Sequence, residues 1–363
     1  MDDLLSKPQM IVHLEHSIPY TVYDTYWIPC SPRLVSLGCH PNGKGALEVL
    51  ELRGQKLQSL ENLFSSSPLK CGSFKSTSQP DRLLVTGDFS GGVKLWDLEA
   101  GTAVWDAKRA HEEIVNAVDG LHSSSRSEIY SGSRDGNVKV WDRRIDPLQG
   151  PVVVMEPEDG EARRDCWSVT CGHAFSEEDR CIAAGFDNGD LKLFDLRALS
   201  LRWETHLKNG ICSLEFDRRT IFMNKLVAST LEGKIHVFDC RTVNPDGSFT
   251  SLCQSLPGSS PRATVWLARH SPFDREVLMT SGGSNGSLQL WKYVYPAEGR
   301  TRKDESTGKE FGVTGELVLL QKAVVASQPV TGFDWHPDKM GLAVASSLDQ
   351  ALRLILVTKL KSI

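Results

Sequence analysis

The sequence has no long apolar run, no closely spaced cysteine pair and no excess of basic residues. No stretch approaches the roughly 18 apolar residues of a membrane helix, and residues 1–10 contain no signal-peptide core. None of the nine cysteines forms a Cys-x-x-Cys pair, which argues against a zinc site with the usual spacing. The formal net charge is −5 and the Lys and Arg residues are scattered, which disfavours nucleic acid as a partner. We expect a soluble cytoplasmic protein that binds no metal, membrane or nucleic acid.

The sequence also lacks a recognisable catalytic motif. It contains no phosphate-binding loop and no paired-carboxylate motif. Its glycine pairs, such as Gly91–Gly92 and Gly282–Gly283, lie in expected hairpin turns and not between a strand and a helix. We therefore expect neither a cofactor nor an enzymatic activity.

A hairpin that ends in Trp-Asp recurs along the chain. The clearest copy is EIYSGSRDGNVKVWD at 128–142, where Asp135-Gly136 forms the expected turn. The positions equivalent to Trp141 are 44 to 64 residues apart and hold Leu50, Trp96, Phe194, Phe238, Trp291 and Ile355. A unit of about 40–45 residues ending in Trp-Asp is typical of a four-stranded WD-repeat blade. The sequence predicts an all-β fold, a seven-bladed WD-repeat β-propeller that fills residues 1–363 as a single domain.

The two ends of the chain are expected to meet in the last blade. Only eight residues follow Ile355, too few for a fourth strand of that blade. The stretch 9–15, QMIVHLE, alternates like a strand and precedes the first complete blade. We predict that Met10 to Leu14 supplies the missing strand, which would remove an exposed sheet edge.

Residues 295–315 form the longest irregular stretch of the sequence. They are rich in Gly, Ser, Thr and charged residues, which indicates a mobile loop. A docking loop is one interpretation, and a tolerated insertion is the one we prefer.

One repeat carries a complete set of polar residues for a network inside the blade: His111, Ser131, Asp135 and Trp141. These residue types also occur in Ser-His-Asp catalytic triads. The structural interpretation is preferred, because a buried indole N–H needs an acceptor and the other three groups satisfy one another. Other copies have lost members, for example Ala184 and Ala228 in place of the Ser.

Aromatic and basic residues are expected around the mouth of the central channel, at the second position of each inner strand and in nearby turns. We predict a protein-binding rim there, because partly exposed Trp, Tyr and Arg are typical of binding hot spots. Its residues are Tyr23, Lys70, Phe89, Arg134, Arg164, Trp167, Phe186, Trp266 and Leu348. The remaining second positions hold Val115, Cys212 and Thr331. The alternative is that Trp167 and Trp266 simply fill the channel wall.

Three copies carry an Arg two places after the repeat Asp, at Arg144, Arg197 and Arg241. The pattern resembles the W-D-x-R box by which some propellers dock onto the adaptor of cullin–RING ubiquitin ligases. The preferred alternative is an Arg that caps a surface turn or pairs with the preceding Asp.

Several segments together resemble the family of Monad (WD repeat-containing protein 92). They are KPQMIVHLEHSIPYTVYD, RDGNVKVWDRR, RRDCWSV, NGDLKLFDLR, LRWETHLKNGICSLEFDR, ATVWLARH and LRLILVTKL. The resemblance runs from about Lys7 to Ile363 and is most specific at 185–239. It implies a role in cytoplasmic preassembly of axonemal dynein heavy chains for motile cilia. It also implies three kinds of partner: a prefoldin-like co-chaperone complex with AAA+ ATPases, a tetratricopeptide-repeat co-chaperone, and dynein heavy chains as clients.

Two classes of function stay open at this point. The first is a non-enzymatic co-chaperone adaptor, expected to be a monomer within larger assemblies. The second is a substrate receptor of a cullin–RING ubiquitin ligase.

Overall fold

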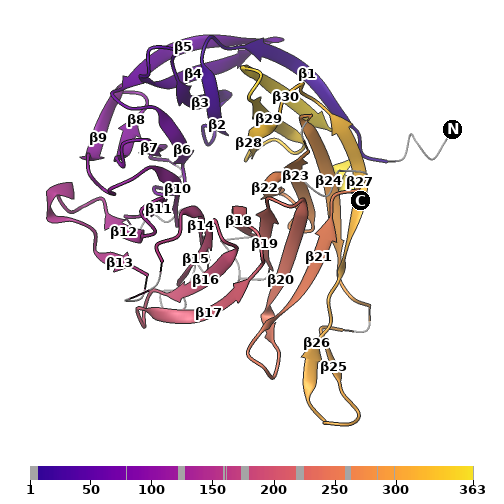
Figure 1. The fold of residues 1–363 in the computed structure, drawn as a ribbon. Coiled ribbons are helices and arrows are strands. Elements are labelled where there is room, and N and C mark those ends of the chain that lie inside the picture. Colours follow the sequence, from indigo (N-terminus) through magenta and orange to yellow (C-terminus); the bar gives the residue numbers. More distant parts are fainter. Residues whose placement is uncertain are drawn as a thin grey trace.

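The computed structural model describes residues 7–78, 80–121, 127–157, 160, 162–172, 180–217, 225–257, 263–283, 285–297 and 299–362. In this described part, seven four-stranded antiparallel sheets follow one another around a central axis, as Figure 1 shows. The predicted seven-bladed propeller is therefore confirmed. No helix of the described residues is long and apolar enough to cross a membrane.

The first three blades each run from the channel outward in chain order. Blade 1 contains β2 (Thr21–Trp27), β3 (Arg33–Cys39), β4 (Gly45–Arg53) and β5 (Lys56–Ser65). Blade 2 contains β6 (Leu69–Ser73), β7 (Leu84–Asp88), β8 (Val93–Asp97) and β9 (Thr102–Ala107). Blade 3 contains β10 (Val115–Gly120), β11 (Glu128–Ser133), β12 (Val138–Asp142) and β13 (Val153–Met155), with the short helix η1 (Pro147–Gln149) before β13.

Blades 4 and 5 repeat this order, and blades 6 and 7 modify it. Blade 4 contains β14 (Cys166–Gly172), β15 (Cys181–Phe186), β16 (Asp190–Asp195) and β17 (Ser200–His206). Blade 5 contains β18 (Ile211–Phe216), β19 (Lys225–Thr230), β20 (Lys234–Val243) and β21 (Phe249–Ser255). Blade 6 contains β22 (Val265–His270), β23 (Val277–Gly282), β24 (Ser287–Val294) and β27 (Glu316–Val324). Blade 7 contains β28 (Val330–Trp335), β29 (Leu342–Ser347), β30 (Ala351–Val357) and β1 (Met10–Ser17), and η2 (Leu360–Ser362) follows it.

The N-terminal strand closes the ring as predicted. β1 pairs antiparallel with β30 from Met10 opposite Val357 to Ser17 opposite Ala351. Met10 is buried in the cluster between blades 6 and 7, and Arg353 donates from Nε to Glu15 across the pair at 3.0 Å. The outer edge of β30 is therefore covered by a strand from the other end of the chain.

The insertion at 295–315 contains regular structure that its composition did not indicate. β25 (Thr301–Lys303) and β26 (Glu310–Gly312) form a two-stranded hairpin that projects beyond the propeller (Figure 1). The Gly312 amide donates to Asn244 Oδ1 at 2.9 Å, so the hairpin is attached to the end of blade 5. The expectation of a wholly irregular loop is corrected, its mobility stays a prediction, and residue 298 lies outside the described residues.

Each of the seven inner strands of the described structure has a β-bulge after its first buried residue. The bulge residues are Tyr23, Lys70, Asn116, Trp167, Cys212, Trp266 and Thr331. A bulge leaves one residue out of the pairing and redirects its side chain. In blade 3 this residue is Asn116, because the strand begins at Val115, whose side chain is fully buried in the core. The placement of Val115 at the channel is therefore wrong.

Candidate protein-binding site at the channel mouth

The four network residues of blade 3 form a continuous chain of hydrogen bonds. Trp141 Nε1 donates to Ser131 Oγ at 3.0 Å, and Ser131 Oγ lies 2.7 Å from His111 Nε2. His111 Nδ1 lies 3.0 Å from Asp135 Oδ2. All four residues are buried, and none is more than 4% exposed. The arrangement satisfies buried polar groups inside the blade and gives no support to catalysis.

Protonation states in this network follow from burial and hydrogen bonding. Burial lowers the pKa of His111 even though the Asp135 carboxylate is adjacent. Burial alone would raise the pKa of Asp135, but hydrogen bonds from His111 and from backbone amides lower it to about 2. The consistent arrangement is a neutral imidazole that donates from Nδ1 to the carboxylate and accepts at Nε2 from the Ser131 hydroxyl.

In other blades the residue equivalent to Ser131 has a hydroxyl group where the residue equivalent to Trp141 is a tryptophan. Trp96 Nε1 donates to Thr86 Oγ1 and Trp291 Nε1 donates to Thr280 Oγ1, each at 2.9 Å. Where the ring is Phe194 or Phe238, the position equivalent to Ser131 holds Ala184 or Ala228, and phenylalanine has no N–H to satisfy. The sequence alone indicated only that Ala184 and Ala228 replace the serine of the hydrogen-bond network.

The channel encloses a cavity of about 470 Å³. Its lining includes five of the predicted rim residues: Tyr23, Lys70, Trp167, Trp266 and Leu348. The side chains of the first four are partly exposed, and Leu348 is 40% exposed at the turn after β29. Residues from five blades are therefore brought to one opening.

Phe89 joins this group from the turn after β7. Its ring centroid lies 5.3 Å from that of Tyr23. Lys70 Nζ lies 5.2 Å from the Tyr23 centroid and 6.0 Å from the Phe89 centroid. The two rings and the ammonium group form a cation–π cluster at the junction of blades 1 and 2.

Arg134 occupies the same turn position in blade 3 as Phe89 and Leu348 in their blades, because the backbone N–H of each donates to the carbonyl of the residue before the inner strand. Arg134 is exposed and pairs with Asp165 at 3.4 Å.

Two other predicted rim residues lie elsewhere, and the first, Arg164, is exposed in a groove between blades 3 and 4. Phe186 is only 7% exposed and packs in the hydrophobic cluster between these blades. Its assignment to an exposed rim is corrected, because Phe186 is the last residue of β15, paired with Cys166, and Asp187 holds the turn position that Phe89 has in blade 2.

Carboxylates below the rim connect neighbouring blades, a feature that the sequence analysis missed. Positions are counted here from the first buried residue of each inner strand. In three blades the carboxylate of the fifth residue accepts the backbone N–H of the sixth residue in the next blade. The pairs are Asp119 with Cys171 N at 3.1 Å, Glu215 with His270 N at 2.5 Å and Asp334 with Trp27 N at 2.9 Å. The signal available in the sequence was the acidic residue just before the end of an inner strand.

The carboxyl groups of the channel differ in pKa, because burial acts against hydrogen bonds and neighbouring charges to a different extent at each one. It raises the pKa of Asp334 to about 7 and that of Asp24 to about 6. For Glu215, hydrogen bonding from His270 and the charges of Arg269 and Lys75 outweigh burial and lower the pKa to about 2. The channel wall below the rim is therefore a mixed polar surface and not an apolar plug.

Comparison with known proteins identifies the family. The model of the WD domain, G-beta repeat, matches residues 106–142. The chain is 49% identical to dynein axonemal assembly factor 10 of Xenopus laevis, over 99% of both chains. It is 48% identical to the Homo sapiens protein of that name, over 98% of this chain and 99% of the relative. The Chlamydomonas reinhardtii protein is 43% identical, over 99% and 100%. The chain belongs to the dynein axonemal assembly factor 10 family.

In this member of the dynein axonemal assembly factor 10 family, the Asp-x-Arg segments are surface turns. The Oδ1 atoms of Asp142, Asp195 and Asp239 accept the backbone N–H of the Arg two places later, at 2.8 to 3.0 Å. Two of the guanidinium groups also pair with the same carboxylate: Arg144 with Asp142 at 2.6 Å and Arg241 with Asp239 at 2.8 Å. This geometry favours the turn-capping interpretation.

The described residues contain no group of three or more His, Cys, Asp or Glu side chains arranged to hold a metal ion. With the hydrogen-bond network enclosed in blade 3, the channel mouth is the candidate functional site in this family member.

Proposed function

We propose that the protein is a non-enzymatic adaptor in the assembly of axonemal dynein. The relatives that share nearly the whole chain carry the name dynein axonemal assembly factor 10, which supports this role. A propeller fold with a buried polar network supports a scaffold. On this proposal the chain is a counterpart of Monad and acts in the cytoplasm.

The partners proposed for the channel mouth are proteins of the dynein preassembly machinery. They are a prefoldin-like co-chaperone complex with AAA+ ATPases, a tetratricopeptide-repeat co-chaperone and dynein heavy chains as clients. The observation that carries the proposal is the convergence of Trp167, Trp266 and the Tyr23–Phe89–Lys70 cluster on one opening. Large, partly exposed aromatic groups beside a cation are typical anchors of protein interfaces.

A pull-down from ciliated-cell cytosol tests this proposal. The wild-type chain is compared with a Trp167→Ala/Trp266→Ala variant. A matched control, Phe64→Ala/Val104→Ala, removes two exposed apolar side chains from outer strands. We expect the rim variant, but not the control, to lose co-chaperones or dynein chains while its melting temperature equals that of wild type. Equal recovery by all three proteins would exclude the channel mouth as the binding site, and absence of these partners from wild type would refute the adaptor role.

The ubiquitin-ligase receptor is a competing function, and no contact among the described residues favours it. Replacing Arg144, Arg197 and Arg241 with Ala would abolish recovery of a cullin–RING adaptor if that function held. The adaptor proposal predicts unchanged partners for this triple variant.

A further inference from the structure

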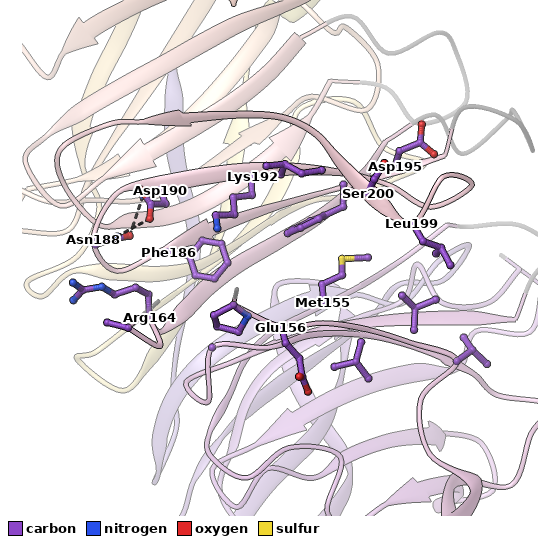
Figure 2. A pocket seen from close by; sticks show the side chains of 18 residues that line it. Met155, Glu156, Arg164, Phe186, Asn188, Asp190, Lys192, Asp195, Leu199 and Ser200 are labelled. Carbon is purple, nitrogen blue, oxygen red and sulfur yellow. Dashed lines mark hydrogen bonds between the residues drawn. The ribbon is translucent and has the colours of Figure 1, made fainter. Parts of the chain in front are cut away.

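The hydrophobic core between blades 3 and 4 is open on the outside of the ring. Of the seven residues in the position of Trp141, all within the described part, six are buried. Phe194 alone stays partly exposed, and it packs beside Val153 and Met155 at the edge of the inter-blade cluster. A groove of about 700 Å³ lies over this opening, as Figure 2 shows.

The outer strand of blade 3 carries a small residue beside this opening. In blade 2, Trp105 lies opposite Leu95, and its ring contacts Trp141 of blade 3 at a centroid distance of 5.9 Å. In blade 4, Trp203 occupies the same register position and contacts Phe238 of blade 5 at 5.4 Å. The corresponding residue of blade 3 is Val153, opposite Val140.

This difference in size accounts for the exposure of Phe194. A valine side chain is too short to cover a neighbouring ring as an indole does. Trp141 and Phe238, which a tryptophan covers, are each 3% exposed.

The strand beside the groove has an unused edge. β13 has three residues, whereas the outer strands β5 and β27 have ten and nine. In the described structure β13 pairs with β12 on one side and with no strand on the other. An open edge of this kind presents backbone N–H and C=O groups that pair with an added extended peptide.

The charges of the groove favour an acidic group at one end. Arg164 lies at that end, and no carboxylate of the described residues forms an ion pair with it (Figure 2). Asp190, nearby, is already held by His206 at 2.8 Å and Asn188 at 2.7 Å. The Glu156 carboxylate points away from Lys192 in Figure 2. The available charge at this end is therefore positive.

We propose that this groove binds an extended segment of a partner protein that carries an aromatic residue next to an acidic one. The segment adds to β13 as a further strand, and its aromatic ring covers Phe194 as Trp203 covers Phe238. The outer strands β9 and β17 of this chain contain the same two residue types side by side, at Trp105-Asp106 and Trp203-Glu204. The site lies on the outer surface, separate from the channel mouth, so it stands or falls independently of the proposed function.

Titration of the full chain with a fluorescein-labelled hexapeptide tests the inference. The probe has the sequence of residues 102–107, TAVWDA, and a second probe has alanine in place of its tryptophan. We expect saturable anisotropy changes with the first probe and at least tenfold weaker binding of the second. Absence of saturable binding by the first probe, or equal binding of the two, would overturn the proposal.

Substitutions at and away from the groove test whether the probe binds there. Val153→Trp supplies the missing cover and should weaken probe binding at least tenfold while the melting temperature stays equal or rises. Val104→Trp, at an exposed position of β9, is the matched control and should bind as wild type does. Arg164→Glu should weaken binding about two- to fivefold, as expected for the loss of one exposed ion pair.

The Met155 methyl group gives a local readout of binding to the wild-type chain. Among the methionines that the structure describes, Met155 is the one that lines the groove. Its carbon-13 methyl resonance, assigned by Met155→Leu, should shift on addition of the probe. Binding that leaves this resonance unchanged, or that Val153→Trp does not affect, would overturn the proposed site.

Discussion

Replacing Ser131 with alanine is expected to destabilise the protein strongly, because one hydroxyl satisfies two buried groups. Ser131 is fully buried, and its Oγ lies 2.7 Å from His111 Nε2 and 3.0 Å from Trp141 Nε1. Ser131→Ala leaves both nitrogens buried without a partner. Each unsatisfied group costs about 1–3 kcal/mol, so the free energy of unfolding should fall by about 2–6 kcal/mol.

A second substitution separates the two contributions. Trp141→Phe in the Ser131→Ala background removes the unsatisfied indole N–H and recreates the combination of Phe and Ala that blades 4 and 5 hold at these two positions. We expect it to recover about 1–3 kcal/mol of hydrogen-bond penalty, offset by about 1 kcal/mol of lost packing against Trp105. In the wild-type background the same substitution should only destabilise.

Urea unfolding followed by far-ultraviolet circular dichroism measures this double-mutant cycle. Ser66→Ala, at an exposed serine, is the control and should leave the unfolding midpoint unchanged. The reasoning is refuted if the effects of Ser131→Ala and Trp141→Phe add to within about 0.5 kcal/mol.

Three further outcomes follow from the closure of the ring, the channel carboxyl groups and the cysteines. Deleting residues 1–17 exposes the edge of β30 and removes the buried Met10, so calorimetry should show a loss of about 3 kcal/mol or more, and an unchanged melting temperature would contradict the closure argument. Burial raises the pKa of Asp334 to about 7, above its value in the unfolded chain, so its contribution to stability is lost as pH rises from about 4 to 7. Asp334→Asn should therefore stabilise the protein relative to wild type more at pH 8 than at pH 5, and a pH-independent difference in urea midpoint would contradict this. Iodoacetamide should label the exposed Cys30 and Cys253 first, and mass spectrometry that finds early labelling of a buried cysteine such as Cys166 would contradict the burial assignments.

The repeat pattern predicted the fold because its information is local. A hairpin with Asp-Gly between alternating apolar residues indicates the same two strands wherever it occurs, and counting its copies indicates the number of blades. The strand that completes the last blade could be predicted from the alternating pattern of residues 9–15 together with the repeat position of Ile355. The hydrogen-bond network of blade 3 could be predicted because its four residue types stand at their repeat positions in the sequence.

Strand boundaries limited the prediction of the channel lining. The sequence placed Val115 at the channel, whereas β10 begins at that residue and its bulge falls on Asn116. A shift of one position moves a side chain to the opposite face of a strand. Phe186 was misplaced by one position in the same way, because it is the last residue of β15, opposite Cys166, and the turn begins at Asp187.

What the sequence by itself determined is the all-β repeat, the closure by β1 and the residue types available at the channel. Only the tertiary structure decided which groups meet across blades. The hydrogen bond from the Trp27 N–H to Asp334 joins residues at opposite ends of the chain, and Phe194 packs against the same cluster as Val153 of another blade. Periodicity describes contacts within one repeat, whereas these features depend on the volume and register of residues in neighbouring repeats.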